Sequence, residues 1–328
     1  MICYSYSALY WIAVAFVLWL STLPASGQQD FQYSSKKQRQ TSTLVQKSKS
    51  TQQALLWRIE GKGIKCPSYL FGTIHRLCVQ DVKLGKSVRR ALAATQQIAL
   101  ELDINALASS PNAELLMQAS LMRGDTTLEM LIDDEEAMET VRTYAQSVLG
   151  LPLLPPLNRI KPMVLAMMLL TTHEDDCEQT SLEEVLVKLA QQQNKPIIGI
   201  ETVEQQIALF DSVPYRQQAE MLVQDIKATI QPEAANVSNV SLRRIVALYK
   251  AGRIAELLDI LERTYGMQGR VTELMVDQRN RAWLPTIEKL IGEKATFIAV
   301  GAGHLVGEVG LVALLRSRGF HVLPLSTR

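Results

Sequence analysis

The sequence predicts an α/β (or α+β) fold in which helices flank a central mixed sheet and a large helical lobe is inserted. Short apolar runs of strand length alternate with helical spacing in the first and last parts of the chain. Between them, residues from about 106 to 194 have mostly helical spacing and no strand pattern. We therefore expect one folded domain, 54–328, that carries this lobe.

The first 27 residues have the pattern of a secretory signal peptide. Ala8–Leu23 is almost entirely apolar and small residues follow, so we expect cleavage after Gly27. An uncleaved membrane anchor is the alternative, because the apolar run approaches the roughly 18 residues that a spanning helix needs. Under either interpretation we expect an exported protein, periplasmic or extracellular, and the anchor would add a membrane tether through residues 8–23.

Residues 28–53 form a linker that we expect to be disordered. Large apolar side chains are scarce in this segment, so burial cannot offset the entropy lost on ordering. Over the whole chain, 34 basic residues balance 33 acidic ones. This balance gives no general attraction to nucleic acid, and we expect no such partner. The sequence carries no signal for an oligomeric state.

The folded part begins with a predicted β-hairpin. Two apolar runs, Ala54–Glu60 and Ser68–Gly72, surround a glycine-rich turn, which is typical of paired strands. A helix is predicted from Leu84 to Gln96, where apolar residues recur on one side. The short apolar run Ile98–Leu102 then predicts a buried strand.

Capping residues divide the helical part of the chain. Helix starts are predicted at Asp133, Lys161 and Ser181, the first and last of them with a glutamate three residues later. Ile197–Ile200 predicts a further short strand. A helix should follow it at once, because Thr202 begins a Thr-x-x-Gln capping pattern.

One strand pattern occurs twice. Tyr69–His75 and Phe297–His304 are each an apolar strand that ends in Gly-x-x-His and leads to a helix and then another strand. For the second copy these elements are the strand Thr296–Val300, the helix Leu305–Arg318 and the strand Phe320–Leu325. The same context around both histidines makes chance a poor explanation.

Four ionisable residues lie at predicted carboxyl ends of strands: His75, Glu101, Glu201 and His304. Open α/β sheets bind their ligands outside these strand ends. Two imidazoles and two carboxylates at one sheet edge suit a divalent cation of the zinc, manganese or cobalt class. The pattern therefore predicts a metal site at this edge.

Glycines beside the histidines support a ligand site at these turns. Gly72, Gly301 and Gly303 allow sharp turns and a close approach of the ligand to the backbone. The helix expected after each turn would direct its N–H groups at the same place, which favours anionic oxygens.

Six blocks of the sequence, in the same order, resemble the TraB/GumN family, which is related to the TIKI metalloproteases and more distantly to erythromycin esterases and ChaN. They are the segments Phe71–His75, Leu100–Asp103, Lys161–Pro162, Gly199–Gln206, Asp277–Trp283 and Val300–Leu305. One further segment departs from the family pattern, since Ser181-Leu182-Glu183 stands where many relatives have Gly-Leu-Asp. For that reason Glu183 is left out of the predicted site.

The resemblance implies a metal-dependent hydrolase that acts on peptides or small molecules. In this hypothesis His75, Glu101 and His304 bind the metal, Glu201 is the general base and Arg279 stabilises the oxyanion. A metal-free variant, with His75 as the base, stays open. The alternative from another class is a protein that binds haem, iron or a peptide without turnover.

Three cysteines remain after the predicted cleavage site. An exported protein is found where disulfides persist, so one bridge and one free thiol are expected. We expect Cys78 to pair with Cys177, because both would flank the predicted site.

Overall fold

The computed structural model describes residues 54–75, 77–103, 116–150, 155–170, 177–231, 242–265 and 272–327. The predicted signal peptide or anchor, 1–27, and the predicted linker, 28–53, lie outside these ranges. Within them, helices surround one six-stranded sheet and a separate two-stranded sheet, so the predicted α/β class is confirmed. None of the helices described is long and apolar enough to span a membrane.

The main sheet has the strand order β6-β4-β7-β2-β1-β8. Its strands are β1 (Leu56–Glu60), β2 (Ser68–Thr73), β4 (Gln97–Leu100), β6 (Ile197–Gly199), β7 (Thr296–Gly301) and β8 (His321–Leu325). Strands β6, β4, β7 and β2 run parallel to one another. Strand β1 is antiparallel to both β2 and β8, so the sheet is mixed. The carboxyl ends of four parallel strands therefore lie at one edge.

The predicted hairpin joins β1 to β2. Its turn needs left-handed backbone at three successive residues, with φ of +87° at Gly61, +47° at Lys62 and +77° at Gly63. Two of these three residues are glycines, which adopt positive φ at little cost. Strand β7 lies between β2 and β4, and all six of its residues are buried. A continuous apolar run such as this one is expected for a central parallel strand.

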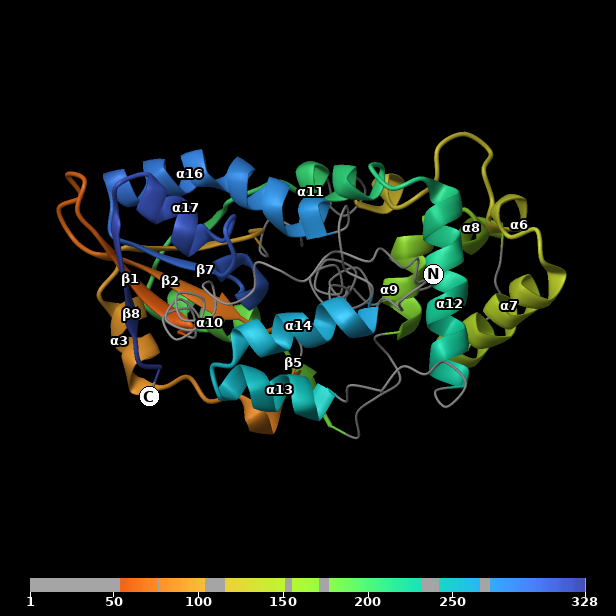
Figure 1. Cartoon of the computed structure of the whole chain (residues 1–328), viewed down its shortest axis with the longest axis horizontal. Helices are drawn as coiled ribbons and strands as arrows, with labels where there is room; N and C mark the ends of the chain where they lie inside the picture. The colour runs from red at the N-terminus through yellow and green to blue at the C-terminus, as the bar shows by residue number, and fades with distance from the viewer. Residues whose placement is uncertain are drawn as a thin grey trace, which may run out of the picture.

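Six helices contribute buried side chains to the hydrophobic core around the sheet. They are α3 (Lys86–Ala93), α10 (Leu182–Gln192), α13 (Leu242–Lys250), α14 (Ile254–Tyr265), α16 (Arg279–Glu293) and α17 (Leu311–Ser317). Figure 1 shows this part of the molecule on the left.

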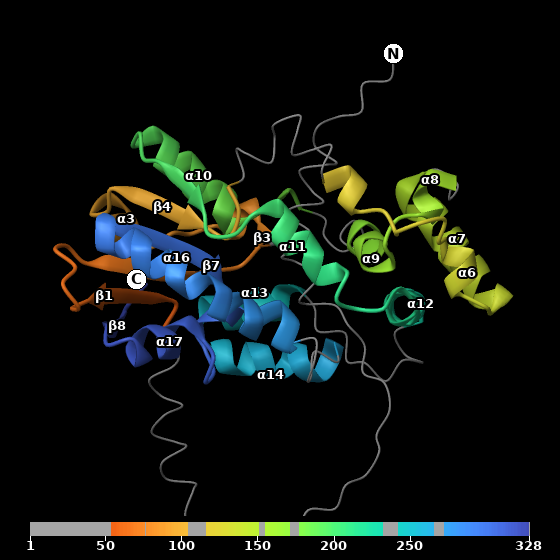
Figure 2. The same cartoon turned by 90° about the horizontal axis from the view of Figure 1, so that it is seen from above.

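A second hydrophobic core lies at the other end of the long axis (Figures 1 and 2). Its helices are α6 (Leu128–Leu131), α7 (Glu135–Leu149), α9 (Pro162–Leu170), α11 (Val203–Phe210), α12 (Tyr215–Ile230) and the π-helix η3 (Glu273–Gln278), and the short helix α8 (Pro155–Asn158) lies beside them. The expected lobe of about 106–194 thus includes α6 to α9, whereas α10 packs against the sheet. Helix α12 joins the second core because it packs along α9.

The helix predicted from Leu84 to Gln96 is confirmed as α3, but the segment between His75 and this helix contains a short strand that was not predicted. Strand β3 (Leu77–Cys78) follows and pairs with β5 (Gln179–Thr180), and a 3₁₀ helix η2 (Val79–Asp81) precedes α3. A disulfide joins Cys78 to Cys177, the pairing expected from the sequence, and Cys66 is exposed and free. Pairing with β5 keeps this segment extended, so no helix begins here.

Two predicted helix starts are wrong. The N-cap of α7 is Asp134, whose side chain accepts from the backbone N–H of Glu136, and not Asp133. After His304, α17 begins only at Leu311, because Gly307 has a φ of +90° and turns the backbone away from helical geometry. The expected pair of helix N-termini directed at the site is therefore absent from the described residues.

Candidate active site

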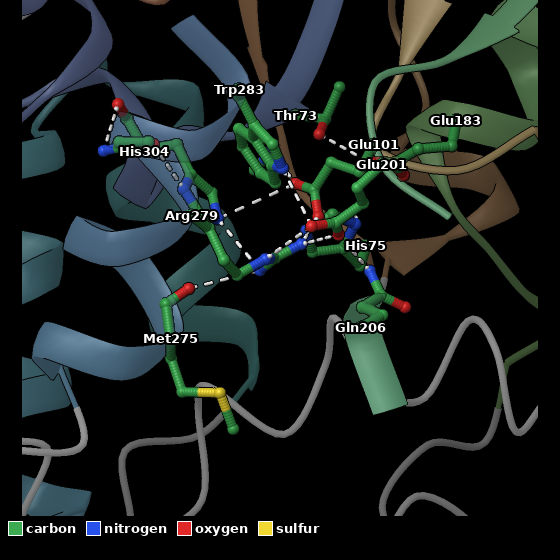
Figure 3. A network of polar contacts seen from close by, with 12 residues as sticks. Thr73, His75, Glu101, Glu183, Glu201, Gln206, Met275, Arg279, Trp283 and His304 are labelled. Atoms are coloured by element: carbon green, nitrogen blue, oxygen red, sulfur yellow. Dashed lines mark hydrogen bonds and ion pairs between the residues drawn. The ribbon is translucent and has the colours of Figure 1, made fainter. Parts of the chain in front are cut away.

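The four ionisable residues at the strand ends come together at one edge of the main sheet (Figure 3). Glu101 follows β4, Glu201 follows β6 and His75 follows β2, while His304 lies in the 3₁₀ helix η4 (Ala302–Leu305) after β7. A Cβ atom built on Gly301 would lie 2.8 Å from Nε2 of His75 and 3.6 Å from Cδ2 of His304. Both imidazole rings therefore face the same short piece of backbone.

Arg279 lies at the centre of this cluster. Its Nη2 donates to Oε2 of Glu101 at 2.6 Å and to Oε1 of Glu201 at 2.5 Å. Its Nη1 donates to the carbonyl of Met275 at 3.2 Å and faces Nε2 of His304 at 3.3 Å. Burial acts to lower the pKa of Arg279, but the two carboxylates more than offset this effect, so the pKa is raised. The buried guanidinium stays charged.

The π-helix η3 positions Arg279. Arg279 is the first residue of α16 and follows η3 directly, and its Nη1 donates back to the Met275 carbonyl within η3. Leu274 and Met275 of η3 are buried in the second core. π-Helical turns in helical proteins often occur at functional sites. The second core therefore holds the element that directs Arg279 toward the sheet edge.

The carboxylate of Glu201 is fully engaged. It accepts from Nε1 of Trp283 at 2.8 Å and from Nε2 of Gln206 at 2.8 Å. It also accepts from Arg279, through Nη2 at 2.5 Å and Nε at 3.3 Å. A carboxylate has about four lone-pair positions, and four donors occupy them. Glu201 is thus arranged to hold Arg279 and not to accept a proton, in contrast with the general-base role expected of it.

Both oxygens of Glu101 are also engaged by donors. Its Oε1 accepts from the backbone N–H of Gly301 at 2.8 Å, and its Oε2 accepts from Arg279 at 2.6 Å. Burial acts to raise the pKa of Glu101, but Arg279, with further contributions from His304 and His75, lowers it to about 2. Glu101 is therefore an ionised partner of Arg279 at any pH near neutrality.

His75 has a different partner, Glu183. Its Nδ1 lies 2.8 Å from Oε1 of Glu183, and the hydroxyl of Thr73 donates to the same oxygen. Burial acts to lower the pKa of His75, but the charge and hydrogen bond of Glu183 more than offset it, so the pKa is raised. The side chains of His75 and Glu183 retain 10% and 12% exposure, against 1% for His304. His75 is therefore the more basic and the more accessible of the two imidazoles.

His304 is buried and stays neutral. Its Nδ1 lies 2.8 Å from Oδ1 of Asn280, and its ring packs on that of Trp283 with centroids 4.5 Å apart. Burial, and then the neighbouring Arg279 and His75, lower the pKa of His304 to about 3 despite the opposing charge of Glu101.

The three predicted glycines have different neighbours. A Cβ on Gly301 would clash with His75, so this glycine makes room for the imidazole. A Cβ on Gly72 would lie 2.6 Å from Leu305, so Gly72 allows η4 to pack closely on β2. A Cβ on Gly303 would meet Leu258 at 3.4 Å. Of the three, Gly301 is the one that faces the polar cluster.

Sequence reasoning missed Glu183. Glu183 is excluded from the site predicted from the sequence because its side chain is one methylene longer than the aspartate found in many relatives. The structure shows that the longer side chain still reaches Nδ1 of His75, because Leu182 N donates to the Ile74 carbonyl at 3.3 Å and holds the two segments together. Thr73, Gln206, Asn280 and Trp283 were also not predicted as site residues.

The expected metal ligands do not fit a metal ion in this arrangement. In the part of the chain that the structure describes, no group of three or more His, Cys, Asp or Glu side chains could hold a metal. Both oxygens of Glu101 accept from N–H donors, and Nε2 of His304 faces Arg279. A divalent cation among these ligands would lie against the guanidinium and be repelled by it. We therefore derive no chemical step through a metal.

Comparisons with known proteins identify relatives of this chain. Residues 55–324 match the sequence profile of the TraB/PrgY/gumN family. The chain is also 23% identical over 329 residues to a protein of Amphimedon queenslandica named "Metalloprotease TIKI homolog". That alignment covers 84% of this chain and 62% of the relative, so the chain spans less than two thirds of the relative's length. No solved structure matches the chain.

Proposed function

We propose that this chain, which belongs to the TraB/PrgY/gumN family, is a peptide hydrolase whose general base is His75. The relative with a metalloprotease name supports hydrolysis as the class of reaction. The observation that carries the proposal is the contact between Nδ1 of His75 and the Glu183 carboxylate at 2.8 Å. This contact gives the cluster one imidazole with raised basicity and an exposed edge.

His75 acts as base and then as acid. The Glu183 carboxylate accepts a hydrogen bond from Nδ1–H, so the lone pair of the neutral ring is on Nε2. Nε2 takes a proton from a water molecule as the water attacks the peptide carbonyl. The Glu183 carboxylate stabilises the imidazolium that forms, and the ring then returns the proton to the leaving amine.

Arg279 supplies positive charge for the tetrahedral intermediate. Its Nη2 and Nε donate to carboxylates, whereas Nη1 donates to the neutral carbonyl of Met275 and faces Nε2 of His304. The guanidinium attracts an anionic oxygen more strongly than it attracts a neutral carbonyl. In this proposal the substrate oxyanion therefore takes the place of the Met275 carbonyl at Nη1, while the other N–H of Nη1 keeps its contact with His304, and the fixed charge stabilises the oxyanion.

We propose that the protein binds and cleaves its substrate outside the cytoplasm. The Cys78–Cys177 disulfide supports this location, because structural disulfides persist in oxidising compartments. N-terminal sequencing of the mature protein tests the location proposal. A new terminus at Gln28 agrees with it, and an intact Met1 in the cytosolic fraction contradicts it.

The test of function uses the purified chain and a peptide mixture analysed by mass spectrometry. We expect cleavage products with the wild type and none with His75→Ala. The matched control is His321→Ala, because His321 is an exposed histidine on β8, and it should cleave at the wild-type rate. Recovery of every peptide intact from the wild type would reject the hydrolase and favour the alternative of a peptide-binding protein.

A second arm tests whether metal is needed. We expect the wild-type rate to persist after dialysis against a chelator, because His75 activates the water. A loss of activity that zinc, manganese or cobalt restores would contradict His75 as the base. It would show that Arg279 leaves its observed position when metal binds.

A further inference from the structure

We infer that Asn280 is a positioning residue that locks His304 in one neutral tautomer, so that the Nε2 lone pair of His304 holds the Arg279 guanidinium in place. The inference rests on the proposed function for its catalytic consequence. Its structural content, the proton position on His304, is independent of any activity.

The orientation of the Asn280 amide is fixed by its surroundings. Asn280 is completely buried on α16. Its Nδ2 lies 2.9 Å from the carbonyl oxygen of Val309 and 3.3 Å from that of His304. Both neighbours can only accept, so the atom that faces them must be the NH₂ group. A flipped amide would place its oxygen against two carbonyl oxygens inside the protein.

The position of the proton on His304 follows from this orientation. The remaining amide atom, Oδ1, faces Nδ1 of the imidazole at 2.8 Å. Since Oδ1 can only accept, Nδ1 must carry the hydrogen. In the neutral ring the lone pair then lies on Nε2. No other arrangement of protons on a neutral ring satisfies the two carbonyls, the amide and the ring at once.

The lone pair of Nε2 faces an N–H group of Arg279, which can donate a hydrogen bond but not accept one. Nη1 of Arg279 lies 3.3 Å from Nε2, and an arginine has no acceptor atom. The Trp283 ring packs on the imidazole at an angle of 40°, with the centroids 4.5 Å apart, and the guanidinium carbon lies 4.5 Å from the Trp283 ring centroid. His304 and Trp283 therefore hold the guanidinium from one side, and the two glutamates hold it from the other (Figure 3).

The two histidines have different hydrogen-bond partners at Nδ1, and their roles differ accordingly. His75 donates to a carboxylate and is made basic, whereas His304 donates to a neutral amide and remains an acceptor. A protonated His304 would bring an imidazolium against a guanidinium. Burial and Arg279 disfavour this state, and Asn280, which carries no charge, does nothing to offset them as a carboxylate would.

The direct test is NMR of the histidine nitrogens in the full chain labelled with ¹⁵N-histidine. The chain has four histidines, and the His75→Ala, His173→Ala and His321→Ala variants assign the remaining signal to His304. We expect the His304 signal to show a protonated Nδ1 and an unprotonated Nε2 throughout the neutral range. An Nε2–H tautomer, or an imidazolium at neutral pH, would overturn the inference.

Two substitutions test the consequence for Arg279. Asn280→Asp introduces a carboxylate beside Nδ1 and should convert His304 to imidazolium, which repels Arg279 and lowers kcat by about tenfold or more with little change in KM. The control, Asn194→Asp, makes the same chemical change at an exposed position and should leave both constants unchanged. An unaltered His304 signal in Asn280→Asp, or an unaltered kcat in a folded protein, would contradict the inference.

The conservative variant His304→Gln separates an acceptor role from a purely structural one. The amide oxygen of glutamine can accept from Nη1, so His304→Gln should retain at least about tenfold more activity than His304→Ala. Equal activity of the two folded variants would contradict the acceptor role. If the NMR result holds while His75→Ala remains active, the proposed function fails and the tautomer assignment stands.

Discussion

The two histidines of the repeated Gly-x-x-His pattern differ in the group that accepts a hydrogen bond from Nδ1, and this group influences the pKa and the role of each ring. Glu183 raises the pKa of His75, whereas His304, beside the Asn280 amide and Arg279, has a pKa of about 3. The motif itself is the same in both copies. At the scale of residues, the chemistry of the site therefore depends on partners that lie far away in the sequence.

The Glu183→Gln variant tests the carboxylate behind His75. An amide replaces the charge that raises the pKa of His75, so that pKa should fall. Because the base must be neutral to act, the acidic limb of the kcat/KM profile should move to lower pH. The plateau should also fall by about tenfold or more, since the imidazolium loses its partner. Glu178→Gln, an exposed change on the same segment, is the control, and an unmoved limb in Glu183→Gln would reject the role of this carboxylate.

The Gly301→Ala variant tests the space that His75 occupies. The added Cβ would lie 2.8 Å from Nε2 of His75 and 3.4 Å from Oε1 of Glu101, so the imidazole must shift. A displacement of this size in a catalytic group lowers activity by roughly 100-fold. Gly303→Ala, in the same turn, meets only the flexible end of Leu258 at 3.4 Å and should remain active. Similar rates for the two variants would show that the backbone at Gly301 is not close to the reaction.

At the scale of elements, a two-residue strand pair aligns the base with its carboxylate. Leu77 pairs with Thr180 and Cys78 with Gln179, and Val79 N donates to the Glu178 carbonyl at 2.9 Å. The disulfide closes the same junction. Both segments lead directly into the site, one from His75 and the other toward Glu183. The short sheet β3–β5 therefore fixes the distance between these two side chains.

Removal of the disulfide should loosen this junction. The bridge closes a loop with a sequence separation of 99, so the Cys78→Ser, Cys177→Ser double variant should lose roughly 2–5 kcal/mol in free energy of unfolding. Below its lower melting temperature the variant should keep the main sheet but cleave peptides more slowly. Circular dichroism and cleavage rates measure the two effects. Cys66→Ser removes the exposed free thiol and should change neither, and wild-type activity in the folded double variant would contradict the alignment role.

Local sequence signals predicted most of the strands. The hairpin, the strand that became β4 and the repeated strand before each Gly-x-x-His were found because buried parallel strands are continuous apolar runs. The same reasoning found the helix after His75, predicted at Leu84–Gln96 and observed as α3, but it missed the strand β3 before that helix. It also began the helix after His304 at Leu305, whereas α17 begins at Leu311. Pairing with β5 and the positive φ of Gly307 determine these two segments, and local spacing contains no information about either.

The site was harder to predict than the fold. Strand ends indicated His75, Glu101, Glu201 and His304, but the sequence could not show that Arg279 would lie among them. Arg279 was selected only from the family resemblance. In the structure it forms salt bridges with two of the strand-end residues, so the expected metal site is a salt-bridged cluster. The positions of polar side chains relative to each other depend on tertiary packing, which one sequence does not reveal.

At the scale of the whole molecule, the second core buries a carboxyl group whose ionised form it does not stabilise. Asp225 on α12 is buried, and neither of its carboxylate oxygens has a hydrogen-bond partner among the described residues. Burial raises the pKa of Asp225 well above its ordinary value of 3.8. The folded state therefore binds a proton more tightly than the unfolded state, and stability declines as the pH rises above that ordinary value.

The Asp225→Asn variant should be more stable than the wild type at neutral pH. The amide removes the ionisation, which costs up to about 1.4 kcal/mol per pH unit between the ordinary and the raised pKa. The gain in melting temperature should shrink as the pH falls toward 3.8 and vanish below it, where the carboxyl is protonated in both states. Glu220→Gln on the exposed side of the same helix is the control, and a gain that does not depend on pH would reject this explanation.

The position of β7 has a consequence for a growing polypeptide. This strand lies between β2 and β4, yet it begins only at Thr296. A nascent chain that ends before this residue can form the hairpin and the helices, but nothing joins the His75 side of the sheet to the Glu101 side. Arg279 then has no completed edge to occupy. A growing chain must therefore extend beyond Thr296 before the polar cluster at the sheet edge can assemble.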